Sequence, residues 1–180
     1  MKRKSHLELD KIYFLTCTVH QWKKLFTPDK YKLIIIESLN NLIKNNFIKI
    51  YGYVIMPNHI HLLIKLLKLN GKEKPNASFI KETSHLIIKD LKENHDDVLK
   101  KFKVDEHDRV YRVWQRDSLA IEIFNNDMLE QKLEYIHNNP INKKWNLVNE
   151  RDEYTFSSSK YYYQSINDNM LQLTDYRNEF

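Results

Sequence analysis

Alternating apolar and polar residues divide the chain into short extended segments and longer helical ones. Residues 12–19 are rich in β-branched and aromatic side chains and predict a first strand. Two more apolar runs, 47–56 and 59–67, are separated only by Pro57 and Asn58, so they predict an antiparallel hairpin. Further extended pieces are predicted over 109–116 and 119–124.

Helical periodicity marks three other segments. Apolar residues recur every three or four positions over about 30–46 and 77–93, which predicts two amphipathic helices. A third helix is predicted over 128–139, because the polar run 125–127 supplies N-cap chemistry and Pro140 stops the helix.

The order of these elements, strand–helix–strand–strand–helix–strand, predicts the fold class. It favours an α+β, ferredoxin-like sandwich in which an antiparallel sheet has helices packed on one face. The charged stretch 94–108 predicts an irregular connection within this order. No domain boundary is visible, so we expect residues 1–180 to form a single domain, with a core over about 12–163 and a C-terminal extension over 164–180.

Composition and charge narrow the class of protein only a little. The chain of 180 residues is 42% hydrophobic and 12% aromatic, which fits a globular protein that can bury a core without disulfides or other staples. The formal net charge of +5 is mild, since 29 basic residues are mixed with 24 acidic ones. It is a weak indication of a polyanionic partner such as nucleic acid.

The cellular setting is indicated by cysteine content and by the lengths of the apolar runs. The single cysteine, Cys17, cannot form an intrachain disulfide, so we expect a buried thiol in a reducing compartment. No apolar run reaches the length of a membrane span, and the basic start of the chain is followed by polar residues instead of a signal-peptide core. These features predict a cytoplasmic protein with no membrane partner.

A His-x-His triplet opens the second strand of the predicted hairpin. Side chains alternate along a strand, so His59, His61 and Leu63 point to one face. Two imidazoles on one face can converge on a single metal ion or phosphate. The same pattern also fits a pair of exposed histidines on a half-buried strand, and the triplet alone favours that simpler interpretation.

The predicted helix 128–139 carries a second group of candidate residues. Its apolar stripe is formed by Leu129, Leu133 and Ile136. Tyr135 lies off this stripe, and Asn139 follows it one turn later. Tyr135 fits a nucleophilic phenol, or equally a ring at the edge of the core with its hydroxyl in water. Asn139 fits a neutral oxygen ligand or a C-terminal cap.

Together, the two motifs resemble a known family. The resemblance rests on MPNHIHLL at 56–63 and YIHNNP at 135–140, which are similar to the motifs of the single-tyrosine HUH transposases, where HUH means His-hydrophobe-His. The best match is to the REP-associated tyrosine transposase branch of the IS200-like transposases, and the similarity covers about 12–163. Shorter stretches in the family's order and rough spacing are Phe14-Leu15-Thr16, Trp114-Gln115, Ile121-Glu122-Ile123 and Phe156-Ser157-Ser158-Ser159.

The resemblance implies a DNA strand-transfer enzyme on a ferredoxin-like fold. In such proteins two histidines hold a divalent metal, Mg²⁺ or Mn²⁺, and the helix tyrosine attacks the scissile phosphate. The products are a 5′-phosphotyrosine link and a free 3′-hydroxyl. Carried onto this sequence, His59 and His61 become catalytic metal ligands, Asn139 a third ligand and Tyr135 the nucleophile. The implied activity is that of a metal-dependent single-stranded DNA endonuclease and transposase acting on hairpin or repeat DNA.

Two other functions stay open from the residues alone. A domesticated relative would bind hairpin DNA without cleaving it. A metal-dependent hydrolase would use water in place of Tyr135, and it ranks last because no carboxylate general base lies near the histidine pair in sequence. The partners expected are single-stranded or hairpin DNA, and the expected assembly is a monomer or a weak homodimer.

Overall fold

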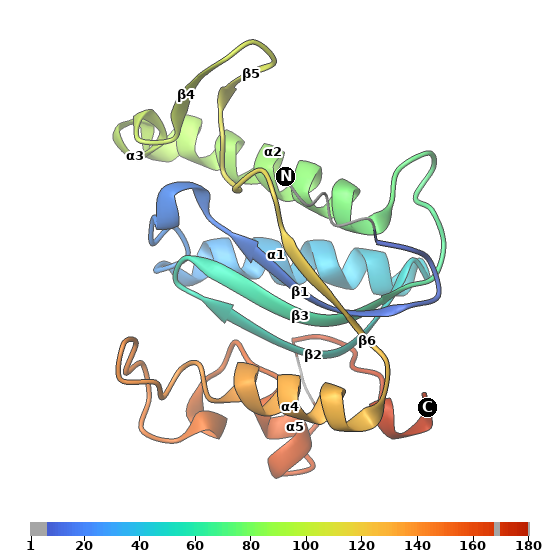
Figure 1. Cartoon of the computed structure of the whole chain (residues 1–180). Helices are drawn as coiled ribbons and strands as arrows, with labels where there is room; N and C mark the ends of the chain where they lie inside the picture. Colours follow the sequence, from blue (N-terminus) through green and yellow to red (C-terminus); the bar gives the residue numbers. More distant parts are fainter. Residues whose placement is uncertain (1–6, 168–169, 180) are drawn as a thin grey trace.

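One four-stranded antiparallel sheet forms the middle layer of the molecule (Figure 1). The computed structural model describes residues 7–167 and 170–179. The elements that build the sheet and its first two covering helices are β1 (Ile12–Thr18), α1 (Asp29–Lys44), β2 (Ile48–Met56), β3 (His59–Leu66), α2 (Pro75–Asn94) and β6 (Leu119–Ile123). Their order along the chain is the predicted one.

The strands lie in the order β2-β3-β1-β6, which is the ferredoxin-like arrangement. β3 pairs antiparallel with both β2 and β1, so the predicted hairpin is confirmed. In the pairing of β1 with β3, Thr16 lies opposite His61 and Thr18 opposite His59. The sheet therefore holds both histidines in a central strand, with a neighbour on each side.

Helices cover both faces of this sheet. Tyr13 and Leu15 of β1 belong to the core that includes residues of α1 and α2, whereas Phe14 packs with residues of α4 (Asn126–His137). Figure 1 shows α1 and α2 on one side of the strands and α4 on the other. The α+β class, the antiparallel sheet and the packing of helices on one face are confirmed for α1 and α2, and α4 adds a cover on the other face. The strands carry apolar side chains on both faces, so both faces have to be covered.

A β-bulge in β2 brings two successive residues to the face of α4. The register with β3 shifts between Ile50 and Gly52. Tyr51 packs with the core under α4, and a Cβ added at Gly52 would lie 3.3 Å from Ile136 Cδ1 of the same helix. A glycine here allows α4 to lie close against the sheet.

The stretch between α2 and β6 is more regular than its charged sequence predicts. It forms α3 (Asp96–Lys100) and a hairpin of β4 (Lys103–Glu106) with β5 (Arg109–Tyr111). Leu99 and Phe102 are almost fully buried and anchor this stretch to the main core. The prediction of irregular structure is wrong because these two anchors are too sparse to give a periodic pattern.

The segment after α4 packs along the edge strand β2. Its short elements are η2 (Arg151–Glu153), α5 (Ser159–Tyr163) and η3 (Tyr176–Asn178), and a further short helix, η1 (His20–Trp22), follows β1. The Ile55 amide donates to the Phe156 carbonyl at 2.9 Å, and the Thr174 amide donates to the Ile50 carbonyl at 2.8 Å. These bonds satisfy backbone groups that an edge strand would otherwise leave unpaired.

Two expectations about the chain as a whole can be checked in the structure. Cys17 is buried, as predicted, and burial raises the pKa of its thiol to about 12. Among the described residues, no helix has both the length and the apolar character that crossing a membrane requires.

Candidate active site

His59 and His61 lie side by side on β3, on the face of the sheet that α4 covers. Their ring centroids are 4.7 Å apart, and the residues are 7% and 5% exposed. This burial excludes the interpretation that they are an exposed pair on a half-buried strand. Phe14 of β1 stacks against His61, with ring centroids 5.1 Å apart.

Hydrogen bonds at Nδ1 hold both imidazole rings. His61 Nδ1 lies 2.8 Å from Thr16 Oγ1, and His59 Nδ1 lies 2.7 Å from Asn58 Oδ1. The Asn58 amide is oriented in turn, because its Nδ2 donates to the Trp22 carbonyl at 3.1 Å. Its oxygen therefore faces His59, so Nδ1 of that ring carries the proton and the lone pair that a metal would bind is on Nε2.

Burial keeps both imidazoles neutral near pH 7. The pKa of His59 falls to about 4, first because the ring is buried and then because Lys144 places a positive charge nearby. The pKa of His61 falls to about 3 through burial and through the proximity of His59 and Lys132. A neutral imidazole has a free lone pair, so the pair is in the protonation state that metal binding requires.

Helix α4 places Tyr135 next to the histidine pair. Its ring centroid lies 5.4 Å from that of His61 and 5.8 Å from that of Phe14, with an edge-on arrangement in both cases. The residues that bury α4 against the sheet are Leu129, Leu133 and Ile136. Tyr135 lies off this stripe and is 52% exposed, so its phenol is beside the histidines and still open to a substrate.

Both ends of α4 are fixed by asparagines. The Asn125 side chain accepts a hydrogen bond from the Met128 amide at 2.9 Å, which confirms the predicted N-cap. At the other end, Asn139 Nδ2 donates to the Tyr135 carbonyl at 2.9 Å. The Asn139 side chain also lies close enough to His59 to favour its charged form by hydrogen bonding, which opposes the lowering of the His59 pKa. Asn139 therefore caps the helix and reaches the histidine pair at the same time.

These residues fit a divalent cation that accepts nitrogen and oxygen ligands. His59 and His61 offer ring nitrogens, and Asn139 offers an amide oxygen from the end of α4. Such a neutral set leaves the full charge of the cation for phosphate oxygens. Among the described residues there is no group of three or more His, Cys, Asp or Glu side chains that could hold a metal ion. The candidate ligand set contains only two residues of these types, His59 and His61, because its third member is an asparagine.

Positive and aromatic side chains border the pair on the side of His59. The Trp145 ring centroid lies 5.8 Å from that of His59. Lys24 and Lys144 place their Nζ atoms 5.8 and 5.7 Å from the centre of the Trp145 ring. Lys144 is close enough to His59 to lower its pKa, so an anion that approached His59 would meet this positive charge.

Two supporting residues could not be assigned from the sequence. Thr16 reaches His61 only because the sheet places these residues opposite each other, and nothing in the sequence gives that register. Asn58 is a turn residue by its sequence context, and its contact with His59 depends on how its amide is oriented. Asn58 lies within the MPNHIHLL motif, but the signal it gives by its residue type is a preference for turns, which indicates backbone shape and not a role at the site.

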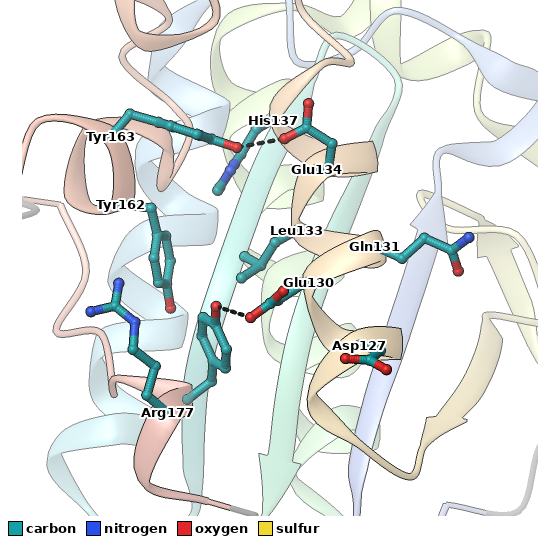
Figure 2. A pocket seen from close by; sticks show the side chains of 10 residues that line it. Asp127, Glu130, Gln131, Leu133, Glu134, His137, Tyr162, Tyr163 and Arg177 are labelled. Atoms are coloured by element: carbon teal, nitrogen blue, oxygen red, sulfur yellow. Dashed lines mark hydrogen bonds between the residues drawn. The ribbon is translucent and has the colours of Figure 1, made fainter.

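A separate groove lies on the other side of α4, between this helix and the C-terminal segment (Figure 2). Its volume is about 620 Å³. Two of its carboxylates are already engaged, because Glu134 accepts from the Tyr163 hydroxyl at 2.6 Å and Glu130 accepts from the Tyr176 hydroxyl at 2.8 Å. Tyr135 does not line this groove, so the candidate chemistry lies at the histidine pair.

The fold and the site define a class: a ferredoxin-like protein whose central strand presents two neutral histidines to a tyrosine on a helix packed across the sheet. No protein-family profile matches the chain. A solved structure of a REP-associated tyrosine transposase bound to a REP hairpin is similar, with 18% identity, a TM-score of 0.60, and coverage of 88% of this chain and 82% of that one. An uncharacterized protein of Haemophilus influenzae is 26% identical over 144 residues, which cover 72% of this chain and 79% of the relative. The transposase fold implied by the two motifs is thus confirmed.

Proposed function

We propose that this protein is a metal-dependent endonuclease and strand transferase for single-stranded DNA, with Tyr135 as the nucleophile. One observation carries the proposal: β3 and α4 bring His59, His61, Tyr135 and Asn139 together on a transposase fold. The similar transposase was solved with a REP hairpin, which supports hairpin or repeat DNA as the substrate class here.

In the proposed reaction, the Tyr135 oxygen attacks the phosphorus of a phosphodiester and the bond from phosphorus to the 3′-oxygen breaks. The products are a 5′-phosphotyrosine link and a free 3′-hydroxyl, which takes up a proton. Because the link preserves the energy of the phosphodiester, the reverse attack rejoins strands without a nucleotide cofactor. The same site would therefore both cut and transfer a strand.

Free tyrosine loses its proton only at about pH 10, so a tyrosine nucleophile needs assistance at neutral pH. A divalent cation such as Mg²⁺ or Mn²⁺, held by the two histidines and Asn139, would polarise the phosphate and stabilise the phenolate. The chain itself orients the nucleophile. The edge contact with Phe14 and the bond from Asn139 to the Tyr135 carbonyl hold the tyrosine beside the histidines.

A covalent-trapping assay tests the proposal. Wild-type protein, Tyr135→Phe and Tyr163→Phe are incubated with labelled single-stranded hairpin DNA from both flanks of the gene, with Mn²⁺, and run on denaturing gels. Tyr163 is a matched control, because it is 47% exposed and lies on the other side of α4. We expect a shifted protein–DNA band in wild type and Tyr163→Phe and none in Tyr135→Phe.

Each other outcome overturns the proposal in a recognisable way. Cleavage that persists in Tyr135→Phe without an adduct indicates a hydrolase that uses water. Hairpin binding without any adduct, on both flanks and both strands, indicates a non-catalytic DNA-binding protein. An adduct that survives in Tyr135→Phe but is lost in Tyr163→Phe identifies a different nucleophile.

A further inference from the structure

We propose that Trp22 and Trp145 form a stacking clamp for an unpaired nucleobase next to the scissile phosphate. This inference rests on the proposed function and adds a base-binding subsite to it. The ring centroids of the two tryptophans lie 6.3 and 5.8 Å from that of His59. Of the three tryptophans in the chain, only Trp114 belongs to the main core, where it is 4% exposed.

Trp22 combines high exposure with a backbone conformation that is uncommon for a tryptophan. It is 56% exposed and has a φ of 58°, and Gln21 before it has a φ of 56°. The left-handed region is uncommon for a bulky side chain, so the surrounding structure has to hold the residue there. The Trp22 amide donates to the Val19 carbonyl at 2.9 Å, and the Trp22 carbonyl accepts from Asn58. An exposed aromatic ring in a constrained backbone favours a binding role.

Asn58 couples this tryptophan to the histidine pair. Its Nδ2 donates to the Trp22 carbonyl at 3.1 Å, while its Oδ1 lies 2.7 Å from His59 Nδ1. One amide therefore fixes both the backbone of Trp22 and the orientation of the proposed metal ligand. A base held by Trp22 would be placed at a set distance from the phosphate held at His59.

Trp145 approaches His59 from the turn that follows α4. The Trp145 amide donates to the Asn142 carbonyl at 2.8 Å, and the Leu147 amide closes the turn on the Pro140 carbonyl at 2.9 Å. Lys24 and Lys144 lie near the Trp145 ring, as described above. The turn therefore presents an aromatic ring with positive charge beside it, which is the combination that binds single-stranded nucleic acid.

The chemistry of the clamp selects an unpaired base. Aromatic planes recognise the faces of bases, which a duplex keeps stacked, and lysines neutralise the backbone on either side. Stacking accepts any base, so the clamp would position the strand without reading its sequence. A protein partner that buries the tryptophans is the alternative use of the same surface, and the experiment below separates the two.

The test is binding of single-stranded DNA by wild-type protein, Trp22→Ala, Trp22→Phe, Trp145→Ala and Phe124→Ala. Phe124 is a matched control, because it is 69% exposed and follows the end of β6 that pairs with Ile12, far along the sheet from His59. We expect each Trp→Ala change to weaken binding by about 5- to 150-fold, as for the loss of one stacked base. Trp22→Phe should recover most of the affinity, and Phe124→Ala should change little.

An abasic scan locates the base in the clamp. Replacing one nucleotide at a time with an abasic residue should weaken binding to wild type at one position beside the cleavage site. The same replacement should have little further effect on Trp22→Ala, because the two changes remove the same contact. Quenching of tryptophan emission by the intact strand should decrease with that abasic strand. Affinities that do not change in Trp22→Ala and Trp145→Ala, or additive effects at every abasic position, overturn the clamp and favour a protein contact.

Covalent adduct formation is measured in the same samples. It distinguishes a failure of the clamp from a failure of the proposed nuclease function. An adduct in wild type together with unaltered affinity in both Trp→Ala variants overturns the clamp and leaves the nuclease. Weakened binding in those variants without an adduct in any sample overturns the nuclease and supports the clamp. If the variants melt at temperatures near that of wild type, a folding defect is excluded as the cause of lost binding.

Discussion

Thr16 is the residue on which the orientation of His61 depends. Its hydroxyl lies 2.8 Å from His61 Nδ1 across the pairing of β1 with β3. Thr16→Val keeps the shape of the side chain and removes this hydrogen bond, so the ring loses its fixed orientation. We expect Mn²⁺ binding to weaken by about 10- to 100-fold, the usual effect of losing a partner of a metal-bound histidine. Isothermal titration calorimetry measures this change.

Thr18→Val provides the control for this prediction. Thr18 lies two residues further along the same strand, opposite His59, and its hydroxyl makes no hydrogen bond to a histidine among the described residues. The Thr18→Val variant should therefore bind Mn²⁺ with the same affinity as wild type. Equal affinities in Thr16→Val and Thr18→Val would show that the hydroxyl does not support the metal ligand.

Because His137 is buried as a neutral ring, the folded protein should be less stable in weak acid than at neutral pH. His137 is fully buried, with Nε2 2.8 Å from Ser158 Oγ, and burial lowers its pKa from 6.5 to about 4. As the pH falls from about 6.5 to 4, the unfolded chain binds the proton first, so stability present above pH 6.5 is lost across this window. The loss is at most about 3.5 kcal/mol, at 1.36 kcal/mol for each of the 2.5 pKa units. Urea unfolding at several pH values measures it.

His137→Gln isolates the contribution of this one ring. Glutamine keeps a polar group near Ser158 and does not titrate, so the free energy of unfolding should depend less on pH between 4 and 6.5. His59 and His61 also have lowered pKa values and contribute in the same direction to both proteins. Parallel stability curves for wild type and His137→Gln would contradict the assignment.

At the scale of elements, the distance of α4 from the sheet depends on Gly52. A Cβ at this position would overlap Leu133 Cδ2 and lie 3.3 Å from both Ile136 Cδ1 and Ser158 Oγ. Gly52→Ala should therefore push α4 away and destabilise the protein by about 1–3 kcal/mol, as overpacking usually does. Because α4 carries Tyr135, the rate of adduct formation should fall as well. Chemical denaturation and the trapping assay measure the two effects.

Two further variants test whether this effect passes through the helix. Gly71→Ala places a Cβ in open space at a φ of 63°, so it should cost backbone strain alone and leave adduct formation unaltered. The double variant Gly52→Ala/Leu133→Val removes part of the overlap and should be more stable than the sum of the single changes predicts. Additive changes in stability would mean that Gly52 and Leu133 do not compete for this space.

The sequence predicts elements better than it predicts their packing. Periodicity and capping residues gave β1, the β2–β3 hairpin and α4, because each depends on neighbours along the chain. The position of α4 across the second face could not be predicted, since it depends on the bulge at Gly52 and on apolar residues contributed by all four strands of the sheet. Leu99 and Phe102 show the same limit, because two anchors give no period.

The candidate site divides in the same way. Strand alternation placed His59 and His61 on one face, and the helical wheel set Tyr135 apart from the apolar stripe. That the tyrosine lies beside the histidines followed from the family resemblance and not from any local pattern. Thr16 and Asn58 escaped prediction because register and amide orientation arise only when the sheet and its loops are assembled.

At the scale of the whole molecule, a single chain contains every group of the candidate site. The Tyr135 ring lies 5.4 Å from the His61 ring of the same chain, and α4 follows β6 directly along the chain. A mixture of Tyr135→Phe with the double variant His59→Ala/His61→Ala should therefore form no covalent adduct, because each chain lacks a group that its own site needs. Wild-type protein diluted with either variant should form adduct in proportion to its share.

The opposite result would change the view of the assembly. Adduct in the mixture of the two inactive proteins would require that Tyr135 of one chain reaches the histidines of another. The helix would then have to exchange between chains, as in a domain-swapped dimer, with the turn between β6 and α4 as the hinge. Such an exchange has to break the packing of Leu129, Leu133 and Ile136 on the sheet, so it would be slow and would increase with protein concentration. Following the mixture over time at two concentrations therefore decides between one-chain and two-chain sites.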